Sequence, residues 1–73
     1  MQDYIIDVTQ IEEFQTISDL VSLDTIFARA KRTLVNGAKV LLVRKQEEIS
    51  QKFDEFTTLE ELETYKNSVY KYL

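Results

Sequence analysis

The sequence KVLLVRK at residues 39–45 holds the longest apolar run of the chain, four residues between flanking cations. A short apolar run of this kind is typical of a strand inside a sheet. Side chains alternate along a strand, so Val40 and Leu42 point to one face while Leu41 and Val43 point to the other. The segment therefore predicts a strand that is apolar on both faces.

Three other segments are predicted to be strands. The first shows the period of a half-buried sheet, because Tyr4, Ile6 and Val8 occupy alternate positions. The second and third lie before the two helical patterns of the chain. The three segments span residues 3–8, 15–20 and 50–56.

Two helices are predicted from apolar residues at helical spacing. Ser22 and Thr58 are their expected N-caps, and the Asn36-Gly37 pair is expected to end the first helix, because glycine suits the left-handed cap position. The expected apolar stripes are Leu23, Ile26, Phe27, Ala30 and Leu34 in the first helix, and Leu59, Leu62, Tyr65, Val69 and Tyr72 in the second.

A shift of 36 residues brings the two halves of the chain into register. The shift pairs Ile5 with Leu41, and it pairs the expected helix caps with each other. Similarity at a fixed period is the signature of repeated units. We therefore predict one α+β domain over residues 1–73, with an internal repeat of residues 1–36 and 37–73. Its architecture is a two-layer ββα-ββα fold, with a four-stranded, mostly antiparallel sheet and two helices on one face.

An alternative makes residues 10–20 a helix. Thr9 and Glu12 fit a capping box, and Ile11, Phe14 and Ile17 follow at a spacing of three. The element order would then be βααββα, and the repeat would be lost.

The composition excludes several classes of site. The chain has no cysteine, no histidine and one glycine, so it lacks disulfides, the usual nucleophile–base pairs and a phosphate-binding glycine loop. Adjacent carboxylates diverge on a helix or strand, so the Glu-Glu pairs do not predict a metal site. We expect no enzyme activity and no cofactor. The apolar runs are too short for a membrane span, so we expect a cytoplasmic protein.

The net charge of −4 is unevenly distributed along the chain. Residues 1–24 contain six acids and no base, whereas residues 25–46 contain six bases and no acid. Such a block can form a patch that meets phosphates. The alternative function is therefore a small nucleic-acid-associated regulator, and its expected basic patch is Arg29, Arg32, Lys39 and Lys45.

The segment at residues 53–65, with the sequence FDEFTTLEELETY, resembles the strand-to-helix join of small β-β-α modules such as AP2-type and phage-integrase arm domains. The resemblance covers 13 residues and implies DNA recognition by basic and aromatic residues of the strand. The matching strand here has Lys52 but also Asp54 and Glu55, which departs from that pattern, and no family is assigned.

The sheet face opposite the helices is the main predicted site. It would expose Leu41 and Val43 together with Ile5 of the first strand. An exposed apolar face of this kind indicates a partner surface. The sequence thus favours a non-enzymatic protein-interaction module, whose partner is another protein or a second copy in a homo-oligomer.

Overall fold

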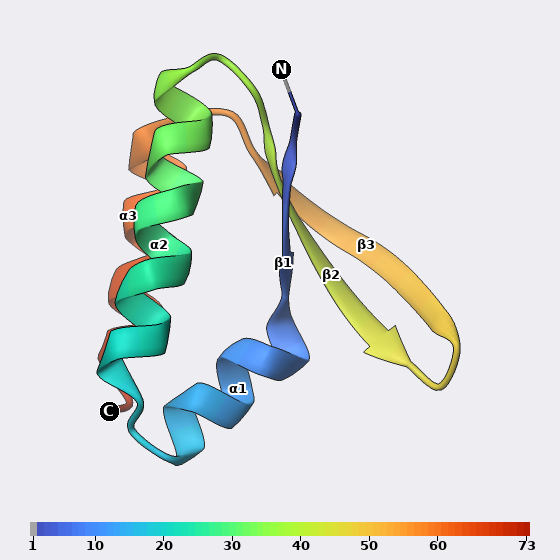
Figure 1. Cartoon of the computed structure of the whole chain (residues 1–73), viewed down its shortest axis with the longest axis vertical. Helices are drawn as coiled ribbons and strands as arrows, with labels where there is room; N and C mark the ends of the chain where they lie inside the picture. Colours follow the sequence, from blue (N-terminus) through green and yellow to red (C-terminus); the bar gives the residue numbers. More distant parts are fainter. Residues whose placement is uncertain (1) are drawn as a thin grey trace.

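The structure is a computed structural model, and it describes residues 2–73. Three helices and a three-stranded sheet form a small two-layer α+β fold (Figure 1). Within the described residues, no helix combines the length and the apolar character that a membrane crossing requires. The elements in chain order are β1 (Tyr4–Asp7), α1 (Val8–Thr16), α2 (Leu20–Val35), β2 (Val40–Gln46), β3 (Ile49–Phe56) and α3 (Leu59–Tyr70).

The sheet differs from the expected four-stranded, mostly antiparallel sheet. It has the order β1-β2-β3, with β1 parallel to β2 and β3 antiparallel to β2. The prediction of four strands and two helices is therefore wrong, and the observed element order is that of the βααββα alternative. The apolar run of residues 39–45 forms a strand as predicted, and this strand, β2, lies at the centre and pairs on both edges.

Residues 15–20, predicted to be a strand, instead finish α1, form the turn and begin α2 at Leu20. Asp7 starts α1, because its side chain accepts a hydrogen bond from the backbone N–H of Thr9 at 3.0 Å. Val8 and Ile11 lie three residues apart on the buried side of the helix, whereas Ile17 is 63% exposed. A strand at residues 15–20 would have needed a buried face, which these residues do not supply.

The 36-residue shift has a different origin from an internal repeat. In the β1–β2 ladder, Ile5 lies beside Leu41 and Ile6 beside Leu42, so residues 36 apart are neighbours in space. The middle elements of the two halves differ, because α1 is a helix and β3 a strand. Moreover, α2 runs antiparallel to β1 whereas α3 runs parallel to β2 (Figure 1). The ββα-ββα repeat is therefore wrong.

The core lies between the sheet and the pair α2 and α3, which cover one of its faces (Figure 1). The predicted stripe of α2 is confirmed, because Leu23, Phe27, Ala30 and Leu34 are buried and Ile26 packs against them. In α3 only part of the predicted stripe is buried: Leu62 and Val69 belong to the core, and Tyr65 packs against it. Leu59 and Tyr72, at the two ends of that stripe, are 41% and 73% exposed.

The ends of α2 show why it begins earlier than expected. Asp19, not Ser22, is the N-cap, and its carboxylate accepts hydrogen bonds from the backbone N–H of Ser22 at 3.1 Å and from the Ser22 hydroxyl at 2.8 Å. At the other end, Gly37 has φ of 86°, the left-handed conformation that glycine adopts without steric cost. The predicted role of Gly37 in ending this helix is confirmed.

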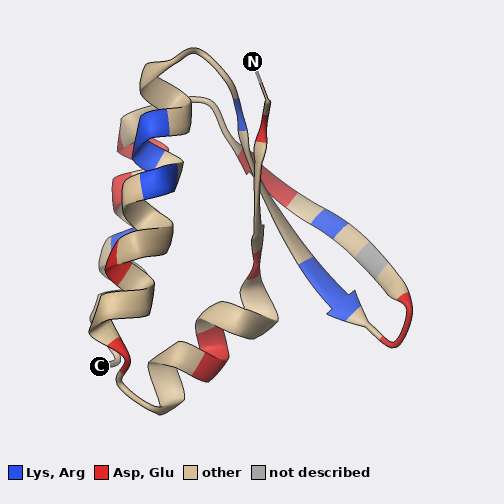
Figure 2. Cartoon of the chain, in the orientation of Figure 1, with Lys and Arg blue, Asp and Glu red and all other residues tan. Residues whose placement is uncertain are grey.

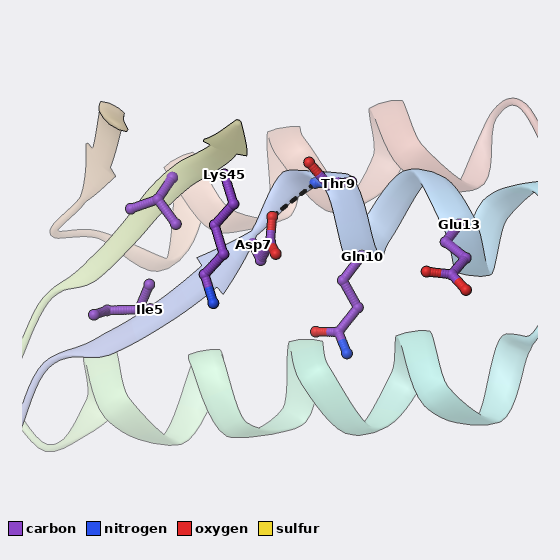
Figure 3. A pocket seen from close by; sticks show the side chains of 7 residues that line it. Ile5, Asp7, Thr9, Gln10, Glu13 and Lys45 are labelled. Carbon is purple, nitrogen blue, oxygen red and sulfur yellow. Dashed lines mark hydrogen bonds between the residues drawn. The ribbon is translucent and has the colours of Figure 1, made fainter. Parts of the chain in front are cut away.

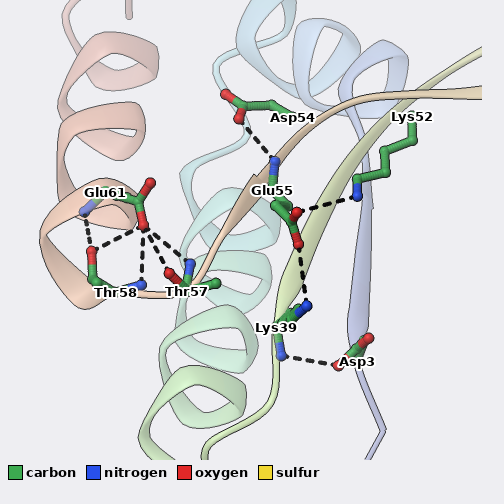
Figure 4. Close-up of polar contacts among 8 residues, drawn as sticks. All are labelled: Asp3, Lys39, Lys52, Asp54, Glu55, Thr57, Thr58 and Glu61. Carbon is green, nitrogen blue, oxygen red and sulfur yellow. Dashed lines mark hydrogen bonds and ion pairs between the residues drawn. The ribbon is translucent and has the colours of Figure 1, made fainter.

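Thr58 caps α3 as predicted, in a complete capping box with Glu61 (Figure 4). The Glu61 backbone N–H donates to the Thr58 hydroxyl at 3.2 Å. In return, the Glu61 carboxylate accepts hydrogen bonds from the backbone N–H groups of Thr57 and Thr58. These bonds, led by the one from the Thr57 N–H, hold the pKa of Glu61 below its ordinary value of 4.5.

This capping box predicts a pH dependence of stability. A carboxyl whose pKa is lower in the folded state stabilises the fold above its unfolded pKa, and that contribution is lost as pH falls through the folded pKa. We expect the urea midpoint of the native chain to fall more than that of Glu61→Gln between about pH 5 and about pH 3. Circular dichroism at each pH measures both midpoints. Parallel decreases in the two proteins would contradict the role of Glu61.

Candidate functional site

The sheet face opposite α2 and α3 brings together the three residues predicted to form an interface. The β1–β2 ladder places Ile5 beside Leu41 and Asp7 beside Val43, so these side chains share one face. Their exposure differs: Ile5 is 57% exposed, Leu41 is half-buried and Val43 is buried. Ile5 is therefore the most exposed apolar side chain of the three.

A groove of about 660 Å³ opens where this face meets α1 (Figure 3). Ile5, Val43 and Lys45 contribute from the sheet, and Gln10 and Glu13 from the helix. Figure 3 shows Ile5 and Lys45 on the two neighbouring strands and Gln10 on the helix that follows β1. The groove therefore combines an apolar floor with polar and charged walls, which suits a protein surface better than a wholly apolar ligand.

Charges flank the apolar residues differently on the two strands. Asp7 lies two positions after Ile5 at the end of β1, and Asp3 lies two positions before it, just ahead of the strand. Lys45 follows the apolar pair Leu41 and Val43 on β2, and Lys39 lies just ahead of that strand. Strand alternation places Asp7 and Lys45 on the open face. The line of one strand thus presents an acid–apolar–acid pattern, and that of its neighbour presents a base–apolar–base pattern. Together these seven residues form the open face: Asp3, Ile5, Asp7, Lys39, Leu41, Val43 and Lys45.

Ion pairs already hold one end of this face (Figure 4). The Glu55 carboxylate of β3 forms ion pairs with two lysines: Lys39 Nζ lies 3.7 Å from Oε2, and Lys52 Nζ lies 3.4 Å from Oε1. The Asp3 carboxylate accepts a hydrogen bond from the backbone N–H of Lys39 at 3.0 Å. At the other end of β2, Lys45 Nζ has no carboxylate oxygen within 4.0 Å among residues 2–73. Lys45 is therefore the cation of the open face that is available to a partner.

The four residues of the expected basic patch do not gather in one place (Figure 2). Arg29 and Arg32 of α2 line a shallow groove beside Asp3, and the Arg29 guanidinium lies 5.6 Å from the centre of the Tyr4 ring. Lys39 pairs with Glu55, and Lys45 lies six residues further along β2, about 20 Å away. The structure thus brings two arginines together with an acid and places Lys45 at the opposite end of the strand.

The C-terminal tyrosines Tyr70 and Tyr72 lie in different surroundings. Tyr70 packs edge-on against Phe27 with ring centres 5.8 Å apart, and its hydroxyl donates a hydrogen bond to Asp24. Burial, reinforced by the bond to Asp24, raises the pKa of Tyr70 to about 12. Tyr72, expected in the core, is exposed. Tyr70 therefore joins α3 to α2, and Tyr72 is free of the core.

Sequence reasoning missed the part of the site that α1 supplies. Thr9, Gln10 and Glu13 line the groove because α1 continues directly from β1 and turns past the end of the sheet. The spacing of Ile11 and Phe14 was the signal that could have found this helix. Within residues 2–73, no three carboxylates lie close enough together to hold a metal ion.

Comparison of the chain with known protein families, with characterised proteins and with solved structures gave no match.

Proposed function

We propose that this chain is a non-enzymatic protein-interaction module that binds its partner through the open face. The observation that carries the proposal is the 57% exposure of Ile5 on the sheet face opposite α2 and α3. A helix packed there, as on the opposite face, would bury this side chain. An exposed aliphatic residue surrounded by charges matches the anatomy of a protein interface, with an apolar centre and a polar rim.

The contrast between the two sheet faces supports this proposal. On the helical side, Ile6, Val40 and Leu42 are each at most 2% exposed. On the open side, the neighbouring Ile5 and Leu41 remain accessible to different degrees. The groove beside α1 adds a recess next to Ile5 into which a partner side chain can insert. A partner would therefore gain most by burying Ile5.

The test uses three baits immobilised by a tag: the native chain, Ile5→Lys and Val21→Lys. Val21 is the matched control, because it is an aliphatic residue of α2 that is 78% exposed and lies outside the open face. We expect a protein from cell extract, or untagged copies of this chain, to bind the native and Val21→Lys baits. The same protein should not bind the Ile5→Lys bait. Thermal denaturation confirms that all three baits are folded. Equal capture by all three baits would overturn the proposal.

A further inference from the structure

The charges of the open face identify its partner, and we infer that a second copy of this chain binds there, face to face. This inference rests on the proposed function and names the occupant of the same surface. Sheets that pack face to face keep their strands within about 30° of one another, so charge rows on the strands can oppose each other directly. Asp3 and Asp7 form an acidic row along the line of β1, and Lys39 and Lys45 form a basic row along the line of β2. At the β3 edge of the face, Glu55 and Lys52 lie beside Leu41 and Val43 and pair with each other.

Two arrangements related by a twofold axis are possible for such a pair. If the axis runs across the strands, β1 lies antiparallel over β1 of the other copy, and Asp3 faces Asp7. If the axis runs along the strands, β1 lies over β2 of the other copy, and the acidic row faces the basic row. Like charges held close together cost free energy, and opposite charges favour association. The charge pattern therefore selects the second arrangement.

In this arrangement the apolar residues meet at the centre. Ile5 and Leu41 lie at the same height in the β1–β2 ladder, so Ile5 of each copy packs on Leu41 of the other. Asp7 is level with Val43 in the ladder, so Asp7 of one copy lies two residues from the level of Lys45 in the other. A lysine side chain can span that distance. Each contact occurs twice because the pair is symmetric. A dimer of standard size buries roughly 800 Å² of each partner, a modest part of the 5246 Å² accessible surface of this chain.

Sedimentation equilibrium from micromolar to hundred-micromolar concentration tests the inference. The native chain and the control Val21→Lys should form dimers. Ile5→Lys should raise the dissociation constant about a hundredfold, because two symmetric apolar contacts are lost. Lys45→Glu should raise it about tenfold, because an acid then faces Asp7 of the other copy.

A charge exchange between copies gives the sharper result. Lys45→Glu and Asp7→Lys should each dimerise weakly alone, whereas their equimolar mixture should form a heterodimer in which both contacts are attractive. Asp7→Lys also removes the N-cap of α1, so circular dichroism checks that this variant is folded. The test with Ile5→Lys does not depend on the Asp7→Lys variant. A mixture that associates no better than either variant, or a dimer unaffected by Ile5→Lys, would overturn the second copy as occupant.

The outcomes separate the inference from the proposed function. The native chain could remain a monomer at every concentration, while the native bait captures a different protein that the Ile5→Lys bait does not. That result refutes a second copy as the partner and leaves the open face as a binding surface. A dimer that survives Ile5→Lys, together with unchanged capture by the baits, refutes both.

Discussion

Replacing Leu23 with alanine is expected to lower the free energy of unfolding by about 2–5 kcal/mol, the range for a leucine-to-alanine substitution that leaves a cavity in a packed core. Leu23 lies on α2 and is 0% exposed, among the core residues that link α2 to the sheet. A chain of this length has roughly 4–10 kcal/mol of stability, so the variant should be close to unfolding. Urea denaturation followed by circular dichroism measures the loss.

Leu59→Ala is the matched control for Leu23→Ala. The shift of 36 residues pairs these two leucines, and an internal repeat would make their substitutions equally costly. Leu59 begins α3 and is 41% exposed, so its replacement should cost less than about 1 kcal/mol. Similar losses in the two variants would mean that the halves of the chain are equivalent after all.

The second large effect is expected at Ile11, which decides between a helix and a strand in residues 10–20. Ile11 is 1% exposed on α1, and Ile11→Ala should cost about 2–5 kcal/mol. Ile17 is 63% exposed in the turn after α1, and Ile17→Ala should change stability by about 0.5 kcal/mol or less. Urea midpoints of the two variants give the comparison. A greater loss for Ile17→Ala than for Ile11→Ala would speak for the strand and against α1.

The local features of the fold could be predicted because single residues determine them. Gly37 takes a positive φ that other residues avoid, and Thr58 satisfies a free backbone N–H at the start of α3. The short apolar run within residues 39–45 indicated a strand, and β2 forms there. These features hold whatever packs around them.

The middle of the first half could not be predicted with the same ease. Residues 10–20 are compatible with both a helical spacing and a short strand, and their pairing with residues 46–56 favoured the strand. The structure resolves this through tertiary packing, in which Ile11 is buried and Arg44 of β2 bonds Glu12 of α1 with 2.6 Å between Nη2 and Oε1. Such contacts join segments 32 residues apart and leave no local sequence signal.

Part of the candidate site could be predicted from the sequence, because strand alternation determines which side chains share a face. Alternation along β2 indicated that Leu41 and Val43 share a face, and the parallel pairing with β1 adds Ile5 to it. The burial of Val43 and the groove beside α1 depend on the helix that the sequence did not establish. The sequence also did not indicate which lysines form ion pairs within the chain. Lys39 pairs with Glu55, so Lys45 is the lysine assigned to the proposed contact with Asp7 of the other copy.

The most direct test of the central claim is an isotope-filtered NOE measurement on a mixture of labelled and unlabelled chains. The open face of one copy should pack on that of another, with β1 over β2. We therefore predict intermolecular NOEs that join the methyl groups of Ile5 in one copy to those of Leu41 in the other. If sedimentation shows a dimer and these NOEs are absent, or if Ile5 contacts only Ile5 of the other copy, the proposed packing is wrong.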